Sequence, residues 1–207
     1  MQEGSRFLEV SSDLWVWGRY EASIRTWMHS TALRAGNGIG WWILDPIVLE
    51  EAEWEQRVRR LGADGGVLGY VVTNGNHERE LARWQERLPG EVLAHAAAME
   101  EISSGVDREL QPGMILAGGY EVVGMEGAGT GEVALLREDV SAHFGDGLLN
   151  LDETGFAFLP EKYCVDAIRL RRSVRRFMDC PVRVATFAHG FPLRGDVGRR
   201  IRALCSG

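Results

Sequence analysis

A short apolar segment that leads directly into a polar turn and then into a helix constrains this fold most. Residues 66–73 are apolar and have the length of a buried strand, far below the roughly 20 residues of a membrane-spanning helix. Residues 80–88 show a helical pattern that Pro89 and Gly90 end. The polar residues 74–79 therefore form a turn at the carboxyl end of a strand, where sheets covered by helices usually place their ligands.

The remaining strand and helix patterns predict an α+β protein. Aromatic and β-branched residues favour strands over residues 14–17, 26–33 and 40–46, and an apolar spacing near four after Pro46 predicts a helix that ends near Gly62. Further strands are expected over residues 91–94, 119–125, 132–137, 141–144 and 182–187, and further helices over residues 96–102, 163–178 and 197–204. We expect one domain over residues 1–207, with helices outside the sheets.

The charged residues are distributed unevenly. The chain has 23 basic and 30 acidic side chains, a formal net charge of −7, yet the part from Lys162 onward holds eleven basic and three acidic residues. This basic end could meet nucleic acid or an acidic partner, or it could be a solvated helix face or lie against the acidic body. We favour the last two alternatives, because arginine-rich helix faces are common and the acidic total opposes binding to nucleic acid.

Cysteine usage and the absence of long apolar segments suggest a compartment. The three cysteines Cys164, Cys180 and Cys205 are odd in number and widely spaced, which fits free thiols better than a disulfide framework. The chain opens with residues 1–5 and lacks the basic segment followed by an apolar segment that is typical of a secretory signal. We therefore predict a cytoplasmic protein without a membrane segment.

Five short motifs occur in an order that resembles a known family. They are Leu44-Asp45-Pro46, Val71-Val72-Thr73 with its polar turn, the glycine-rich residues 127–132, Phe144-Gly145-Asp146, and Ala188-His189-Gly190-Phe191-Pro192. This order resembles the metallo-β-lactamase superfamily over nearly the whole chain. The resemblance implies a four-layer αββα sandwich with a site for one or two zinc or iron ions where the strand-end turns meet.

The resemblance also implies which residues stand at the metal-ligand positions. The family turn has the pattern Thr-His-X-His-X-Asp-His, and its four ligand positions here hold Asn74, Asn76, Glu78 and Arg79. Ala128 replaces a further histidine in the glycine-rich turn, whereas the bridging carboxylate, Asp146, and the final imidazole, His189, are present. One metal position is thereby disabled, because amide oxygens are poor zinc ligands and alanine offers no ligand.

The second metal position leaves several alternatives. Glu78, Asp146 and His189 could still hold one zinc, iron or manganese ion. We favour a site without a cofactor, in which Arg79 points inward, takes the place of the lost ion and pairs with Glu78 and Asp146. An Arg79 that points into solvent is the third alternative.

His77 occupies an X position of the turn, so we expect its ring to point away from the ligand positions. Its usual pKa nevertheless suits proton transfer, which makes His77 a candidate catalytic residue together with Glu78. Asn74, Asn76 and Arg79 are candidates for ligand binding. Asp45 is expected to be a structural carboxylate that orients neighbouring turns.

Two functions follow from these alternatives. The favoured one is a metal-independent binding or regulatory module for a small molecule, because loss of a metal-bound hydroxide removes the nucleophile for hydrolysis. The second is a hydrolase with one reduced metal site at Glu78, Asp146 and His189, acting on an ester, thioester, lactone or phosphodiester. Neither nucleic acid nor a membrane is an expected partner, and assembly into a homodimer is left open.

Overall fold

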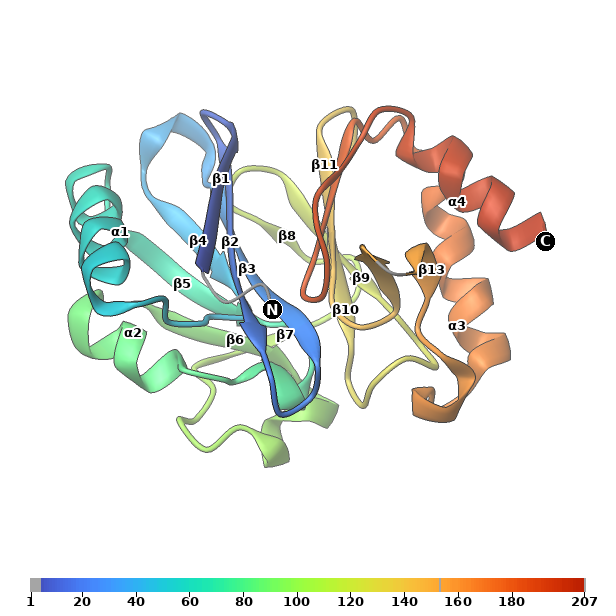
Figure 1. The fold of residues 1–207 in the computed structure, drawn as a ribbon, viewed down its shortest axis with the longest axis horizontal. Coiled ribbons are helices and arrows are strands. Elements are labelled where there is room, and N and C mark those ends of the chain that lie inside the picture. Colours follow the sequence, from blue (N-terminus) through green and yellow to red (C-terminus); the bar gives the residue numbers. More distant parts are fainter. Residues whose placement is uncertain (1–4, 153, 207) are drawn as a thin grey trace.

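Two β-sheets face each other at the centre of the molecule, and helices cover the outer face of each (Figure 1). The computed structural model describes residues 5–152 and 154–206, so residues 1–4, over which the sequence predicts no secretory signal, lie outside it. One apolar cluster lies between the sheets, and two more lie between each sheet and its helices. The predicted α+β class and the αββα sandwich are confirmed.

The first sheet comes from the N-terminal half of the chain. Its strands follow chain order: β1 (Ser5–Ser11), β2 (Leu14–Glu21), β3 (Thr26–Arg34), β4 (Trp41–Leu44), β5 (Val67–Val72), β6 (Glu91–His95) and β7 (Arg108–Leu110). Strands β1 to β4 pair antiparallel, and β4 to β7 pair parallel. Parallel neighbours need crossover connections, and α1 (Glu51–Ala63) and α2 (Leu81–Arg87) provide two of them.

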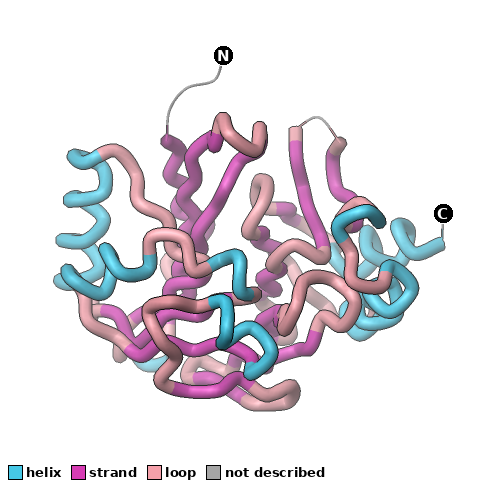
Figure 2. The backbone as a smooth tube through the Cα atoms, turned by 90° about the horizontal axis from the view of Figure 1, so that it is seen from below, coloured by secondary structure: helices cyan, strands magenta, loops and turns pink. Residues whose placement is uncertain are grey.

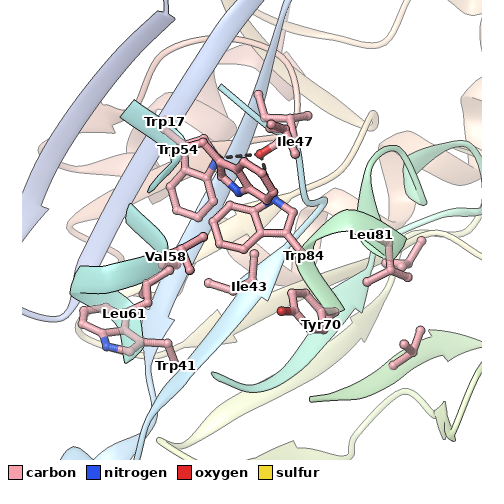
Figure 3. Packing of buried hydrophobic residues seen from close by; sticks show 14 of the residues in the cluster. Trp17, Trp41, Ile43, Ile47, Trp54, Val58, Leu61, Tyr70, Leu81 and Trp84 are labelled. Carbon is pink, nitrogen blue, oxygen red and sulfur yellow. Dashed lines mark hydrogen bonds between the residues drawn. The ribbon is translucent and has the colours of Figure 1, made fainter. Parts of the chain in front are cut away.

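Tryptophans fill the layer between this sheet and its helices (Figure 3). Trp17 of β2 and Trp84 of α2 are fully buried, and both indole Nε1–H groups donate to the carbonyl oxygen of Ile47, at 3.0 and 2.9 Å. One carbonyl thus satisfies two buried donors that would otherwise be costly to bury. These bonds fix the connection after β4, and with it the position of Asp45.

The second sheet comes from the C-terminal half. Its strands lie in the order β15 (Leu193–Arg194), β14 (Val184–Phe187), β11 (Ser141–Phe144), β10 (Val133–Arg137), β9 (Tyr120–Gly124) and β8 (Ile115–Leu116). Only the β11–β14 pair of this described sheet is parallel. The helices α3 (Ala167–Val174) and α4 (Val197–Ser206) pack on its outer face, and the hairpin of β12 (Leu148–Leu151) and β13 (Gly155–Phe158) lies beside it (Figure 2).

Two expected helices differ from the prediction. The helix expected over residues 163–178 begins only at Ala167, because the Asp166 carboxylate caps it by accepting the N–H groups of Ile168 and Arg169. The one expected over residues 96–102 is a 3-10 helix, Ala96–Glu101. No helix among the described residues is long and apolar enough to cross a membrane.

Main-chain hydrogen bonds join the two sheets at one edge. The N–H of Val133 donates to the carbonyl of Thr73 at 2.9 Å, and the N–H of His29 donates to the carbonyl of Ala188 at 2.8 Å. Thr73 and Ala188 directly follow β5 and β14, so these bonds lie where the turns leave the sheets. The same edge therefore carries the predicted site.

Candidate functional site

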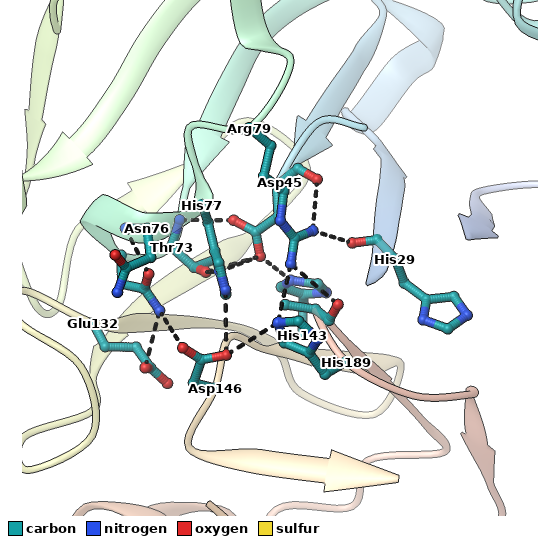
Figure 4. Close-up of polar contacts among 12 residues, drawn as sticks. His29, Asp45, Thr73, Asn76, His77, Arg79, Glu132, His143, Asp146 and His189 are labelled. Carbon is teal, nitrogen blue, oxygen red and sulfur yellow. Dashed lines mark hydrogen bonds and ion pairs between the residues drawn. The ribbon is translucent and has the colours of Figure 1, made fainter. Parts of the chain in front are cut away.

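Four strand ends deliver their turns to this edge (Figure 4). Asp45 follows β4, residues 73–79 follow β5, Asp146 comes shortly after β11, and His189 comes shortly after β14. β4 and β5 are parallel, so their carboxyl ends lie at the same edge of the first sheet, and the same holds for β11 and β14 in the second sheet. As a result, one ligand-type atom each of His77, Asp146 and His189 lies within 4.8 Å of the others.

Asp45 is the buried centre of the arrangement, with no solvent exposure. Its Oδ1 accepts the N–H of Thr73 at 2.9 Å, and its Oδ2 accepts the Thr73 hydroxyl at 2.8 Å. Oδ2 also lies 3.2 Å from His77 Nδ1 and 3.3 Å from His143 Nε2. Burial acts to raise the pKa of Asp45, but the charge of His77 and the hydrogen bonds of both rings hold it well below its usual range.

The ring of His77 points into the site, contrary to the prediction (Figure 4). Its Nδ1 lies 2.9 Å from the hydroxyl of Thr73, which itself donates to Asp45 and so accepts from Nδ1–H. Its Nε2 lies 3.2 Å from Asp146 Oδ1. Burial acts to lower the pKa of His77, but the charges of Asp146 and Asp45 raise it to about 9, so the ring is a cation at neutral pH.

Glu78 points elsewhere, which corrects the expected ligand set. Its carboxylate accepts the N–H groups of Ser103 and Ser104, at 3.0 and 2.6 Å, and the Ser103 hydroxyl at 2.9 Å. The predicted set of Glu78, Asp146 and His189 is therefore not assembled. Residues 75–77 form a 3-10 turn, in which successive side chains rotate by about 120°, so this turn directs His77 inward and Glu78 outward.

Arg79 points inward, as favoured, but its partners differ from those expected. Its guanidinium donates to the carbonyl oxygens of His29 (2.7 Å), Asp45 (3.1 Å) and Ala188 (3.3 Å) and to His189 Nε2 (3.3 Å). Within the described residues, no ion pair shorter than 4 Å joins Arg79 to Glu78 or Asp146. The arginine thus binds a main-chain carbonyl within β3 and the carbonyls of the residues that directly follow β4 and β14, so its contacts come from both sheets.

The site-facing nitrogen of His189 is already a hydrogen-bond acceptor. Its Nδ1 lies 3.1 Å from the carbonyl oxygen of Trp27, which can only accept, so Nδ1 carries the proton. Nε2 therefore presents its lone pair to the N–H of Arg79. Burial and the charge of Arg79 lower the pKa of His189 to about 4, which keeps the ring neutral.

Asn74 stands where the family resemblance places a histidine ligand, but its amide acts as a donor. Its Nδ2 lies 3.3 Å from Glu132 Oε2 and 3.2 Å from Asp146 Oδ2, so it links two carboxylates. Burial and the charge of Asp146 raise the pKa of Glu132 to about 7. The side chain of Asn76 is exposed, and Ala128 is buried among apolar residues.

Three residues of this network were not predicted from the sequence: His29, Glu132 and His143. Each lies in or beside an otherwise apolar strand. His143 of β11 is paired in register with Thr186 of β14, and the ring lies 2.9 Å from the threonine hydroxyl. A polar residue inside an apolar strand pattern was therefore the available signal.

The donor types of His77, Asp146 and His189 are those that zinc sites use. All three residues are already engaged in other contacts, however. Arg79 donates to His189 Nε2, and the Nε2 of the protonated His77 faces Asp146. A metal ion at these three atoms would have to displace a proton from His77 and a hydrogen bond from His189, and it would lie beside the permanent cation of Arg79.

The sandwich fold and its edge site define a known class of protein. The family model described as the metallo-beta-lactamase superfamily matches residues 9–202. The chain belongs to this superfamily.

Several solved structures share the fold. The DIM-1 metallo-beta-lactamase has a TM-score of 0.74 and 15% identity, covering 98% of this chain and 97% of that one. A beta-lactamase domain protein from Burkholderia ambifaria has a TM-score of 0.71 and 21% identity, covering 97% and 75%. A metallo-beta-lactamase family protein from Thermus thermophilus has a TM-score of 0.67 and 17% identity, covering 95% and 79%. The comparison with curated proteins gave no match.

The titrating groups of the site predict a stability maximum near neutral pH. Burial lowers the pKa of His29 to about 3 and of His189 to about 4, and it also lowers that of His143. Below about pH 6.5 these three rings take up protons mainly in the unfolded chain, so stability falls as the pH decreases. Glu132, with its pKa raised to about 7, has the opposite effect: below that pH the folded protein holds a proton on this carboxyl, which offsets about one of the protons that the unfolded chain takes up. His77 has the opposite sign, because its contribution is complete below its unfolded value and is lost as the pH rises through about 9.

Urea unfolding between pH 5 and pH 9.5 measures both branches. On the acid side we expect unfolding to take up a net one to two protons. The free energy of unfolding should therefore change by about 1.4–2.7 kcal/mol per pH unit. A free energy of unfolding that stays constant between pH 5 and pH 7 would contradict the neutral, buried state of the three rings.

Proposed function

We propose that this protein is a metal-independent member of its superfamily that serves as a binding or regulatory module for a small molecule. The observation that carries the proposal is the hydrogen bond from Arg79 to His189 Nε2. The lone pair that His189 would offer to an ion is used by the protein's own cation.

The charges of the site support this proposal. Asp45 and Asp146 carry lowered pKa values and are anionic, while His77 and Arg79 are cationic, so two negative charges already face two positive charges. A dication added to this balanced set would find no net negative charge among these four groups to compensate the cost of removing it from water. The positive charges of His77 and Arg79 thus balance the two carboxylates without a bound ion.

The residues at the first metal position of the family also favour a binding role. Asn74 donates to two carboxylates, Asn76 is exposed, and Ala128 has no ligand atom. Without an ion to generate a hydroxide, the described residues supply hydrogen-bond donors and acceptors for a polar small molecule. We also propose a cytoplasmic location, which the free thiols of Cys164, Cys180 and Cys205 support.

A second candidate function rests on the same three donor atoms. If His77 loses its proton and Arg79 moves, then His77, Asp146 and His189 could hold one zinc, iron or manganese ion in the manner of a catalytic site with an open position. This candidate is a hydrolase of an ester, thioester, lactone or phosphodiester. It uses His77 in place of the predicted Glu78.

Elemental analysis of the protein purified without added metal separates the two candidates. We expect zinc, iron and manganese far below one ion per chain, and a Tm that a chelator does not change. Stoichiometric metal, together with a chelator that lowers both Tm and the turnover of a model ester, would establish the second candidate instead. The variant Asp146→Asn serves as a control, because it removes the central carboxylate and so must abolish any genuine metal binding at this place.

A further inference from the structure

A row of three residues across the first sheet leaves a hollow on its inner face. Arg6 of β1 is paired with Gly18 of β2, and Gly18 is paired with His29 of β3. Residues directly opposite each other in an antiparallel sheet point to the same face. The side chains of Arg6 and His29 therefore rise on the same face from backbones two strand spacings, about 10 Å, apart, and Gly18 puts no side chain between them.

The imidazole of His29 leans over this gap. A Cβ atom at position 18 would lie 2.4 Å from Cδ2 and 2.5 Å from Nε2 of His29, so glycine is required for the ring to take this place. The edge of the ring that carries Nε2 thus extends across Gly18 toward β1. Figure 4 shows the same ring turned away from the His77, Asp146 and His189 cluster.

The hydrogen bonding of His29 fixes which nitrogen carries the proton. The main-chain N–H of Gly190 donates to Nδ1 at 3.2 Å, so Nδ1 is the acceptor and the neutral ring has its proton on Nε2. The residue is only 2% exposed, and among the described residues Nε2 has no hydrogen-bond partner. Nε2 is not among the fully buried atoms without a partner, so it keeps some access to the surface, where this N–H can donate to an acceptor from outside the chain.

The hollow is part of a groove of about 330 Å³ that does not include the His77, Asp146 and His189 cluster. It is lined by residues that include Arg6, Leu8, Val16, His29, Phe191 and Pro192. The guanidinium of Arg6 lies 4.6 Å from the centre of the Trp27 ring and 5.0 Å from that of Phe191, so aromatic faces hold the cation at the groove. None of the lining residues that the structure describes is acidic.

We propose that this groove binds a small monocarboxylic acid with an apolar body. The carboxylate accepts hydrogen bonds from His29 Nε2–H and from the guanidinium of Arg6, and the apolar body contacts Leu8, Val16 and Phe191. The two polar groups are both donors and one is a permanent cation, which selects an anionic acceptor over an amine or a metal ion. The volume suits a compact ring or a branched chain. This groove would bind its ligand whether or not the neighbouring site holds a metal ion.

Benzoate is a suitable probe, because it joins a carboxylate to a flat apolar ring. We expect saturable binding by isothermal titration calorimetry, and a shift of the His29 Nε2 resonance in histidine ring ¹⁵N NMR spectra, assigned by its absence in His29→Phe. Benzamide, which lacks the charge, and the variant Arg6→Ala should each weaken binding by about tenfold or more, the effect of losing a charged hydrogen bond. Arg59→Ala, which removes an exposed arginine from α1, should bind benzoate as the unchanged protein does.

Three results would overturn the proposal. They are the absence of saturable binding, equal affinity for benzoate and benzamide, and an Arg6→Ala variant with unchanged affinity. The groove could alternatively be covered by a second copy of the chain. In that case light scattering would detect a dimer that Leu8→Asp separates, since Leu8 is 43% exposed at the groove, and the carboxylate assignment would fail.

Discussion

Replacing Arg79 with alanine should lower the free energy of unfolding by about 3–5 kcal/mol. The guanidinium satisfies the carbonyl oxygens of His29, Asp45 and Ala188, and the substitution leaves these acceptors without a donor next to the charged Asp45. Urea unfolding at pH 7 measures the loss. The free energy of unfolding of Arg79→Lys should lie between those of the unchanged protein and of Arg79→Ala. An ammonium group keeps the charge, but it lacks the planar fork that reaches all three carbonyls.

Arg25→Ala is the matched control for this substitution. Arg25 and Arg79 both have a left-handed backbone, with φ of 54° and 48°, but Arg25 lies exposed in the turn between β2 and β3. Its replacement should change stability by no more than about 0.5 kcal/mol. Equal losses for the two variants would mean that backbone conformation, and not the carbonyl contacts, determines the effect at position 79.

Replacing Asp45 with asparagine should cost about 3–5 kcal/mol, the range for removing one partner of a buried ion pair. The carboxylate accepts from Thr73 through both oxygens and faces the rings of His77 and His143. An amide of the same shape turns an NH₂ group toward some of these donors. The pKa of His77 should also decrease, because Asp45 is one of the two carboxylates that raise it. Histidine NMR titration checks this second effect independently of unfolding.

Asp139→Asn controls for the chemical change itself. Asp139 has a φ of 61° against 51° at Asp45, and asparagine tolerates this left-handed region as well as aspartate does, so neither substitution adds backbone strain. Asp139 is exposed, and its replacement should be nearly neutral. A similar cost at both positions would contradict a special role for the buried Asp45 carboxylate.

The central elements of the fold follow from local patterns in the sequence. The apolar residues 66–73 form β5, and the pattern after Pro46 forms α1, which ends one residue past the predicted Gly62. The short strands β7, β8 and β15 were not predicted, because two or three residues are too few to show alternation. Such strands form because a neighbouring strand offers free N–H and C=O groups, which is tertiary information.

The site was predictable in its location and less so in its contacts. Asp146 and His189 lie where the motifs place them, since the turn after each strand is set by the sheet. His77 points into the site in place of the predicted Glu78 because residues 75–77 form a 3-10 turn. The direction in which this turn points each side chain cannot be read from a sequence motif. The partners of Arg79 are carbonyl oxygens, and main-chain groups leave no trace in a sequence pattern.

The main-chain bonds from Val133 to Thr73 and from His29 to Ala188 have a practical consequence for ligand discovery. These two amide protons lie in different sheets, yet both depend on the same edge remaining closed, so they should exchange with deuterium through one shared opening event. A compound that binds only the closed edge would slow both exchange rates by the same factor, which rises with the concentration of the compound relative to its Kd. Deuterium uptake at Val133 and His29 would therefore reveal an occupant whose chemical identity is still unknown.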